Sequence, residues 1–310
     1  MIKPVYVVSG FLDSGKTSFI KETLSDPDFT GGSSTLIIAF EEGDEPFDKE
    51  FLQKTSSQVV YLDRMADLTK EKMAQLDKAY EFDRVFLELN GLERDGDLYD
   101  RGFYKNWELA ESLAILDGSA LSNQLTNMRT FVFDHIRYAD VAIINRCDDL
   151  DKVYIRNNFK GANPRLQLLF ETKAHEVSTI SDVDLFTIKD GEVDIAANDY
   201  GLWYIDWTEN PMKYDQVKAT LRMVYFHSIP EEKNAVIMGR RVMTCCANDI
   251  QPLAITVLGA DRDKMTIGDL YEVHGKIRIV PDSQNYANVI FYADRITHLE
   301  KPEDDLVYFN

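Results

Sequence analysis

The first part of the chain alternates short apolar runs with longer segments of helical periodicity. The apolar runs predict strands at residues 5–9, 35–40, 58–62, 84–89, 112–117, 141–145 and 166–170. Apolar residues spaced three and four apart predict helices at residues 67–80, 119–138 and 152–159. Nearly continuous apolar strands need cover on both faces, so we predict an α/β domain with a mainly parallel sheet and helices on both faces.

The pattern changes after about residue 200, where apolar runs follow one another closely and turn residues separate them. This spacing predicts strands at residues 202–205, 224–226, 235–238, 242–244, 254–258, 277–280 and 289–292. Strands this close together are typical of an antiparallel sheet or a small barrel. The polar segment 188–198 contains Gly191 and marks the boundary. We therefore predict a first domain at residues 1–195 and a smaller β-rich domain at residues 196–310.

A phosphate-binding motif follows the first predicted strand. Residues 10–17 satisfy the pattern G-x-x-x-x-G-K-[ST] and lead into a helical segment that continues over residues 18–24. Lys16 would neutralise β- and γ-phosphate oxygens, the Thr17 hydroxyl would ligate Mg²⁺, and the positive helix N-terminus would face the anion. The motif predicts a P-loop nucleotide-binding protein. Its predicted phosphate-binding residues are Gly10, Ser14, Gly15, Lys16, Thr17 and Ser18.

A second motif, at the end of the strand predicted over residues 141–145, concerns the base. Asn145, Arg146 and Asp148 differ at one position from the guanine-reading pattern N-K-x-D. A carboxylate at Asp148 can accept hydrogen bonds from guanine N1–H and the N2 amino group, which adenine does not offer. The Arg146 stem can cover the base as lysine does. The alternative is an ordinary turn with Asp148 or Asp149 as a helix cap.

Two acidic segments lie between these motifs. Glu88 ends a predicted strand and is followed by Gly91, so its carboxylate can hold Mg²⁺ through water and the Gly91 N–H can sense a γ-phosphate. Earlier, residues 41–45 form an acidic loop in which Glu42 is predicted to reach Mg²⁺. The predicted magnesium residues are Thr17, Glu42 and Glu88. The alternative is that these acidic segments are only solvated surface.

Charge and cysteine content narrow the classes of partner and compartment. The formal net charge of −19 argues against nucleic acid and anionic membranes, because such binding relies on basic patches. No charged-then-apolar leader and no long apolar stretch is present, so we expect no export and no direct membrane insertion. Three cysteines, of which Cys245 and Cys246 are adjacent, do not suggest a disulfide framework. We predict a cytoplasmic protein.

At these residues the chain resembles the CobW/HypB/UreG family of P-loop GTPases, most nearly its CobW-like branch. The resemblance covers roughly residues 3–180 and is carried by residues 7–12 with 14–17, residues 88–92, residues 116–118, residues 139–140 with 145–148, and residues 163–164. It implies GTP hydrolysis with Mg²⁺, nucleotide-dependent association with a partner or a second copy, and delivery or regulation of a transition metal.

The chain departs from the family pattern in two ways. CobW-like members usually carry a C-x-C-C motif, whose thiolates suit Zn²⁺, but the matching interval 51–84 contains neither cysteine nor histidine. Asp13 stands where the family usually has glycine. Asp13 is predicted to orient the attacking water or contact an opposing subunit, and the alternative is that it points outward. The predicted catalytic residues are Lys16, Asp13 and Glu88.

Cys245 and Cys246 are the other residues with chemical potential. Adjacent residues on a strand point to opposite faces, so both bind one metal only if the backbone turns or another chain contributes. The alternative is a pair of buried structural cysteines. Residues 235–280 also resemble the C-terminal domain of YcgQ-type bacterial proteins, which show C-C-x-x-D. That resemblance implies a metal-related role, with Zn or another transition metal, or a permease-like partner.

The sequence thus predicts a Mg²⁺-dependent GTP-binding protein and slow GTPase, linked to metal homeostasis or to metal or cofactor delivery. Slow turnover is expected because no arginine is evidently placed as a finger. The alternatives are a nucleotide-gated adaptor or assembly switch with little hydrolysis, and an ATP-dependent P-loop kinase or ATPase. A protein client, metal-handling or permease-like, and a nucleotide-dependent homodimer are the expected partners.

Overall fold

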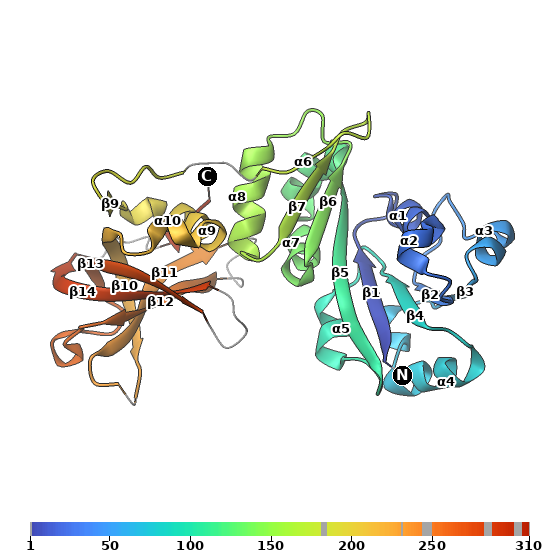
Figure 1. Ribbon diagram of the computed structural model, residues 1–310, viewed down its shortest axis with the longest axis horizontal. Helices are drawn as coiled ribbons and strands as arrows, with labels where there is room; N and C mark the ends of the chain where they lie inside the picture. The colour runs from blue at the N-terminus through green and yellow to red at the C-terminus, as the bar shows by residue number, and fades with distance from the viewer. Residues whose placement is uncertain are drawn as a thin grey trace. The chain divides into compact units, whose positions relative to one another are not determined.

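The computed structural model describes residues 2–180, 185–230, 232–243, 250–281, 287–300 and 306–309. Contacts divide the chain into two compact units, which can be followed by colour in Figure 1. Unit 1 comprises Met1–Lys152 and Leu166–Ile180, and unit 2 comprises Val153–Arg165 and Ser181–Asn310. The domain boundary predicted between residues 195 and 196 stays a prediction.

Unit 1 contains an 8-stranded sheet in the order β3-β2-β4-β1-β5-β6-β7-β8. All of its described strand pairs are parallel except β7 with β8. The strands are β1 (Lys3–Ser9), β2 (Thr35–Ala39), β3 (Ser57–Tyr61), β4 (Arg84–Glu88), β5 (Trp107–Asp117), β6 (Val141–Asn145), β7 (Gln167–Glu171) and β8 (Val177–Ser178). The predicted mainly parallel sheet is confirmed. Because strands β1 to β7 run in the same direction, their carboxyl ends lie at one edge of the sheet, where ligands bind in such sheets.

The helices of unit 1 are mostly short. They are α1 (Lys16–Ser25), α2 (Pro27–Thr30), α3 (Lys49–Lys54), α4 (Lys70–Ala79), α5 (Gly96–Arg101), α6 (Gly118–Asn127) and α7 (Arg129–Tyr138), with a 3₁₀ turn, η1, at Met65–Asp67. The single helix predicted over residues 119–138 is broken at Met128, whose φ of −132° and ψ of 28° are not helical. Local caps begin several of these helices, such as Asp117, whose side chain accepts from the Ser119 N–H.

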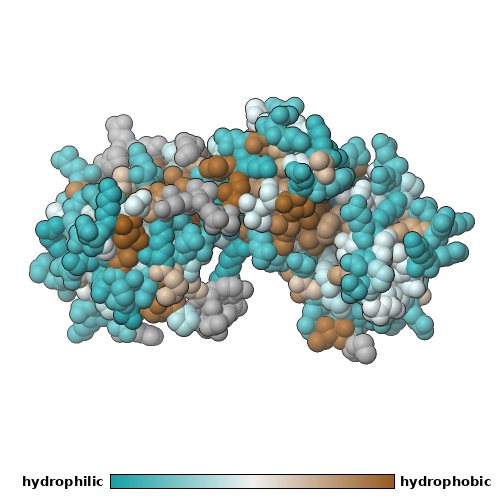
Figure 2. Space-filling view, turned by 45° about the horizontal axis from the view of Figure 1, so that its top comes forward, coloured by the Kyte–Doolittle hydropathy of each residue, from teal (hydrophilic) through white to brown (hydrophobic). Residues whose placement is uncertain are grey.

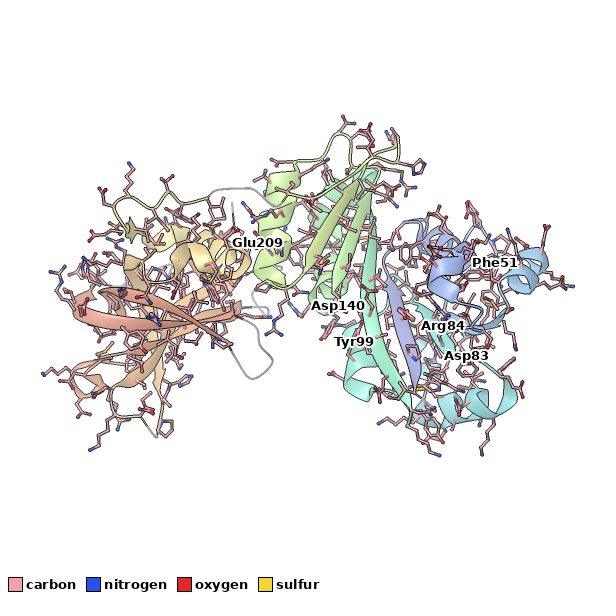
Figure 3. All side chains as sticks on the ribbon, viewed as in Figure 1. Phe51, Asp83, Arg84, Tyr99, Asp140 and Glu209 are labelled. Atoms are coloured by element: carbon pink, nitrogen blue, oxygen red, sulfur yellow. The ribbon has the colours of Figure 1, made fainter. Side chains whose placement is uncertain are left out.

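Helices cover both faces of this sheet, because alternate residues of each strand enter two different hydrophobic clusters. Val5 and Val7 of β1 pack with Met73 of α4 and Leu98 of α5. Val8, the next residue along, packs with Ile20 and Leu24 of α1. Arg84, which begins β4, holds α2 in place by donating to the carbonyl oxygens of Phe29 and Thr30, and Asp83 before it accepts from the N–H of Ser34, which precedes β2 (both labelled in Figure 3). The α/β prediction with helices on both faces is therefore confirmed.

Unit 2 is built on a second, 7-stranded sheet in the order β15-β11-β12-β14-β13-β10-β9. Its strands are β9 (Glu192–Asp194), β10 (Lys218–Ser228), β11 (Ala235–Met243), β12 (Ile250–Leu258), β13 (Leu270–Pro281), β14 (Ala287–Leu299) and β15 (Leu306–Val307), with 3₁₀ turns η2 (Ala197–Asp199) and η4 (Arg262–Lys264). An additional pairing of β10 with β11 closes the sheet into a barrel. The β-rich second region is confirmed.

The barrel has a specific topology. Around the ring, β10 pairs with β11, β11 with β12, β12 with β14, β14 with β13, and β13 with β10. All of these pairs are antiparallel except β12 with β14. A register shift between Tyr225 and His227 lets β10 bend from one neighbour to the other. This strand order is that of an OB-fold, a small Greek-key barrel.

One predicted strand of this region is wrong. Residues 202–205 lie in helix α9 (Tyr200–Glu209), which is followed by α10 (Pro211–Tyr214). Tyr200, Trp203 and Trp207 are buried and spaced three and four residues apart, which is the helical period. Their large apolar rings resembled a strand in a short window, but the repeat identifies a helix packed on the barrel core.

Helix α8 (Lys152–Ala162) belongs almost entirely to unit 2, although it precedes the barrel strands by many residues in the sequence. Asn158 Nδ2 donates to the Phe309 carbonyl oxygen at 3.3 Å, and a Cβ on Gly161 would lie 2.1 Å from the Phe309 ring. Arg156 pairs with Glu209 of α9, and Lys160 Nζ lies 3.1 Å from the other carboxylate oxygen of Glu209 (labelled in Figure 3). The chain's last described residues thus fix α8 to α9.

The visible surface is mostly hydrophilic, with scattered apolar residues (Figure 2), as expected for a chain of high net charge. Among the described helices, none is both long and apolar enough to cross a membrane.

Candidate functional site

The loop between β1 and α1 is shaped by its glycines. Gly10 has a φ of 133°, and a Cβ there would lie 2.1 Å from the Ile115 carbonyl oxygen. Gly15, at the start of α1, has a φ of 103°. Asp13 between them also adopts a positive φ, 60°. These left-handed positions curl the backbone around the N-terminus of α1, which is the geometry of a phosphate cradle.

Lys16 lies inside this curl with its side chain only 3% exposed. Its Nζ donates to the carbonyl oxygens of Gly10 and Phe11, both at 2.8 Å. It also contacts Glu41 Oε1 at 2.5 Å. The ammonium group is therefore aimed at the centre of the loop, where a phosphate chain would lie.

Thr17 and Glu88 meet beside Lys16. The Thr17 hydroxyl donates to Glu88 Oε1 at 2.6 Å, joining the start of α1 to the end of β4. Burial raises the pKa of Glu88, and the Thr17 hydroxyl and Lys16 offset part of that rise. A hydroxyl and a buried carboxylate are hard oxygen donors, so these residues fit Mg²⁺. They would hold the cation that screens phosphate charge when it is bound.

Two further predicted residues, Gly91 and Ser14, lie in or against the phosphate loop. Gly91 packs against the loop so tightly that a Cβ would lie 2.5 Å from both the Gly10 carbonyl oxygen and Phe11 Cα. The Ser14 hydroxyl is buried and has no hydrogen-bond partner in the described part of the chain. The close approach requires glycine at position 91, and a bound phosphate would give the buried Ser14 hydroxyl a partner.

The loop leads into two neighbouring pockets. The smaller, about 190 Å³, is lined by Lys16, Thr17 and Glu88 together with acidic residues of the 41–45 loop. The larger, about 570 Å³, is lined by Gly15, Asn145 and Arg146 together with residues that follow β7. Ser18 and Glu45 line both. Among the described residues, five carboxylates and two cationic side chains, Lys16 and Arg146, line the first pocket, so a phosphate there would need a cation beside it. The second pocket is large enough for a nucleoside.

The base motif is tied to the phosphate loop by direct hydrogen bonds. Asn145 Nδ2 donates to the Ser14 carbonyl oxygen at 2.7 Å, and Arg146 Nη2 donates to the Asp13 carbonyl oxygen at 3.0 Å. Arg146 also pairs with Asp117 at 2.9 Å, and the buried Asn145 Oδ1 has no partner among the described atoms. The two motifs, far apart in the sequence, therefore form one site.

Asp148 lies beside this pocket and is held by the segment after β7. Its Oδ2 accepts from the Lys173 N–H at 3.2 Å, and Asp148 is not among the residues lining the pocket. Glu171, Thr172, Lys173 and His175 line it instead. The base-reading role of Asp148 stays a prediction.

Sequence reasoning missed several residues of the site. They are Glu41, Asp117, Glu171, Thr172, Lys173 and His175. A usable signal existed, because Asp117 and Glu171 end strands of a parallel sheet and residues 172–175 follow one of them, where ligand contacts gather.

The acidic loop differs in detail from the prediction. Glu42 was singled out as a magnesium residue, but its side chain is exposed and does not line the smaller pocket. Its neighbour Glu41 makes the contact with Lys16. Asp13 is exposed and lines the smaller pocket, so the roles predicted for Glu42 and Asp13 remain predictions.

The predicted transition-metal ligands Cys245 and Cys246 lie outside the described residues. In the part that the structure describes, no group of three or more His, Cys, Asp or Glu side chains could hold a metal ion. Cys147 of the base motif is buried and free. His274 of β13 uses both ring nitrogens within unit 2, with Thr220 Oγ1 at 2.8 Å and Glu272 Oε1 at 2.9 Å.

The fold and site define a P-loop nucleotide-binding protein with a parallel sheet. A family model of the CobW/HypB/UreG nucleotide-binding domain matches residues 4–169, more than half of the chain. The chain belongs to the CobW/HypB/UreG family. A model of the DUF1980 C-terminal domain matches residues 171–309, the region in which the sequence resembles YcgQ-type proteins. The family resemblance inferred from the motifs is confirmed.

Solved structures to which the chain is similar include two of the YjiA GTPase. A Zn(II)-bound triple mutant of YjiA is 16% identical, with a TM-score of 0.44, over 83% of this chain and 88% of that chain. Zn(II)-bound YjiA from E. coli is 15% identical, with a TM-score of 0.43, over 85% of this chain and 91% of that chain. None of the curated protein sequences matches this chain.

Proposed function

We propose that this protein is a Mg²⁺-dependent GTP-binding protein and slow GTPase, linked to metal homeostasis or to metal or cofactor delivery. The observation that carries this proposal is the junction of Lys16, Thr17 and Glu88 at the mouth of a pocket that continues to Asn145 and Arg146. Family membership supports guanine nucleotide binding and a metal-related role.

The proposed roles follow from these contacts. Backbone N–H groups of the Gly10–Ser18 loop would bind phosphate oxygens, and Lys16 would neutralise charge that develops on them. Thr17 and Glu88 would hold Mg²⁺, which supplies electrostatic stabilisation when bound. Asn145 and Arg146 would fix the loop against the base, and Asp148 would accept from the guanine edge after leaving the Lys173 N–H. Catalysis would rest on positioning and electrostatics.

Slow turnover is part of the proposal. Arg146 is the arginine that lines the smaller pocket, and it pairs with Asp117 and the Asp13 carbonyl oxygen. An arginine engaged in this way is not available as a finger on the transferred phosphoryl group. Replacing Asp13 by glycine tests whether its carboxylate orients the attacking water: unchanged GTP turnover would exclude that role.

Base specificity is tested by Asp148→Asn. A carboxamide offers a donor to the O2 of xanthine and loses one acceptor for guanine. We expect GTP affinity to fall about a hundredfold and xanthosine triphosphate to bind better than GTP. Competition of each nucleotide against fluorescent GDP measures this. Equal displacement of GDP by ATP and GTP in the unmodified protein would contradict the guanine assignment and favour the ATPase or kinase alternative.

A nucleotide-gated adaptor with little hydrolysis is the second candidate. Five of the described carboxylates line the smaller pocket, which favours binding that depends on a cation over rapid chemistry. Phosphate release with GTP and Mg²⁺, with and without Zn²⁺, separates the two functions. Binding without turnover in every condition supports the adaptor.

The setting of this function is also proposed. We expect a cytoplasmic protein with a protein client, metal-handling or permease-like, and nucleotide-dependent pairing with a second copy. Identifying the metal and the protein that co-purify from metal-limited cells tests the client. Loss of bound metal after replacing Cys245 and Cys246 by serine would support a metal site in the second region.

A further inference from the structure

Three consecutive side chains at the start of α1 each contact a carboxylate. Lys16 meets Glu41 at 2.5 Å, Thr17 meets Glu88 at 2.6 Å, and Ser18 donates to Glu45 Oε2 at 2.9 Å. Glu88 belongs to the sheet, but Glu41 and Glu45 belong to the single loop that follows β2. One loop therefore supplies two carboxylates to the phosphate-binding end of α1.

The hydrogen-bonding capacity of Lys16 is fully used. An ammonium group carries three protons, and Nζ already donates to Gly10, Phe11 and Glu41. Two of these acceptors are carbonyl oxygens of the phosphate loop itself. A phosphate oxygen can therefore gain Lys16 most directly by replacing Glu41, which is the acceptor that carries a negative charge.

The two carboxylates lie at different points of the site. Glu41 lines only the smaller pocket, beside Lys16 and Glu88. Glu45, like Ser18, lines both pockets and so marks their junction. In a nucleotide whose base fills the larger pocket, the α-phosphate lies at this junction and the β- and γ-phosphates lie beyond it, near Lys16.

We propose that Glu41 and Glu45 are affinity-determining residues of the nucleotide site, whose carboxylates stand in for phosphates until a nucleotide displaces them. This rests on the proposed nucleotide-binding function. Glu41 takes the position of the β- or γ-phosphate and Glu45 that of the α-phosphate. Nucleotide entry then exchanges one set of charge-assisted hydrogen bonds for another and frees the loop over residues 41–45.

The test is nucleotide binding to the full chain in the presence of EDTA, which removes any magnesium role of the acidic loop. Fluorescent GDP, and competition by GMP and ADP, would be measured for Glu41→Gln, Glu45→Gln and the double variant. Glu50→Gln is the matched control, because Glu50 is exposed in α3 and its replacement removes the same charge. Thermal unfolding of each variant confirms that it is folded.

We expect Glu41→Gln to tighten GDP binding about tenfold, the scale of one charge-assisted hydrogen bond, and to leave GMP binding unchanged. Glu45→Gln should tighten both GDP and GMP, and Glu50→Gln should tighten neither. GDP affinities that are the same for Glu41→Gln, Glu45→Gln and Glu50→Gln would overturn the inference.

The outcomes also separate this inference from the proposed function. If ADP binding tightens as much as GDP binding, the guanine assignment fails while the inference stands. If GDP binds the unmodified protein well and no variant alters it, the inference fails while nucleotide binding stands. If no nucleotide binds even the double variant, both fail.

Discussion

The two units bury charged side chains in different ways. In unit 1, Lys16 at the start of α1 and Glu88 at the end of β4 are each 3% exposed and lie on the wall of a pocket. In unit 2, Asp206 is fully buried in α9 and accepts from Lys213 Nζ at 2.6 Å and the Tyr214 hydroxyl at 2.5 Å. Lys16 and Glu88 face a space that a ligand can fill. The contacts of Asp206 come from Lys213 and Tyr214 of α10, the helix that follows α9.

This difference separates function from stability. A buried charge beside a pocket is kept although its burial is unfavourable, and it becomes useful when a ligand completes its contacts. A buried charge whose contacts are with other protein groups stabilises one arrangement of the chain, and removing a partner is costly. Burial alone therefore does not identify a site, and the position of the charge relative to a pocket is what distinguishes the two units.

The largest expected effect comes from Lys16→Ala. Losing the ammonium group should weaken GDP and GTP binding about a thousandfold, because the loop then offers no full charge to the phosphates. Equilibrium titration with fluorescent GDP measures it. Lys49→Ala, at an exposed position of α3, is the control and should bind GDP as the unmodified protein does. If Lys16→Ala changed GDP affinity only slightly, the buried charge of unit 1 would not have the binding role that distinguishes it from Asp206.

The next largest effect is expected in unit 2, from Asp206→Ala. Lys213 and the Tyr214 hydroxyl would lose their shared acceptor, so the free energy of unfolding should fall by about 3 kcal/mol. Urea unfolding measures the loss, with Asp263→Ala at an exposed position as control. GDP affinity should not change. A variant that loses GDP binding while remaining folded would contradict the separation of the two roles.

Glu88→Gln should affect binding and stability in opposite directions. GTP affinity in the presence of Mg²⁺ should fall about thirtyfold, and its magnesium dependence should disappear. Because burial raises the pKa of Glu88, its ionised form is less favourable in the folded state than in the unfolded state. The nucleotide-free variant should therefore melt higher at pH 7, and this gain should shrink as pH falls and the native carboxyl takes up its proton. A lower melting temperature at pH 7 would contradict this reading.

The smallest effect is expected from Lys160→Met. Burial and the nearby Arg156 lower the pKa of Lys160 to about 8. Folded protein therefore releases this proton before unfolded protein does, and stability from this group rises between about pH 8 and pH 10. The variant should be more stable at pH 7 by about 1 kcal/mol, with the difference fading above pH 8. A difference that does not vary with pH would contradict the low pKa.

Much of the fold could be predicted from local pattern. The central strands β2 and β4 follow apolar runs that are buried on both faces, and the glycines of the phosphate loop are fixed by their φ angles and lack of space. The small barrel was one of two predicted forms of the second region, but its closure depends on β10 pairing with β11 and β13, which local patterns do not encode. The strand predicted over residues 202–205 was wrong because aromatic residues suit both a strand and a buried helix.

The site was predictable where a motif fixes spacing and not where a loop supplies single side chains. The phosphate-loop motif singles out Lys16 and Thr17, and the end of a predicted strand singles out Glu88. The structure brings Thr17 of α1 and Glu88 of β4 together. Glu41 was missed in favour of Glu42, since in an acidic loop the backbone direction decides which carboxylate turns inward. Thr172 and Lys173 of the larger pocket were also missed, because they follow β7 without a recognisable motif.

The contact between α8 and Phe309 also has a consequence for the order of events during synthesis. Asn158 and the Phe309 carbonyl oxygen are 151 residues apart in the sequence. The last strand of unit 1 ends at residue 178, so all strands of this unit are synthesised long before Phe309. We therefore expect the nucleotide-binding sheet to form first, with α8 waiting on the nascent chain until Phe309 has emerged.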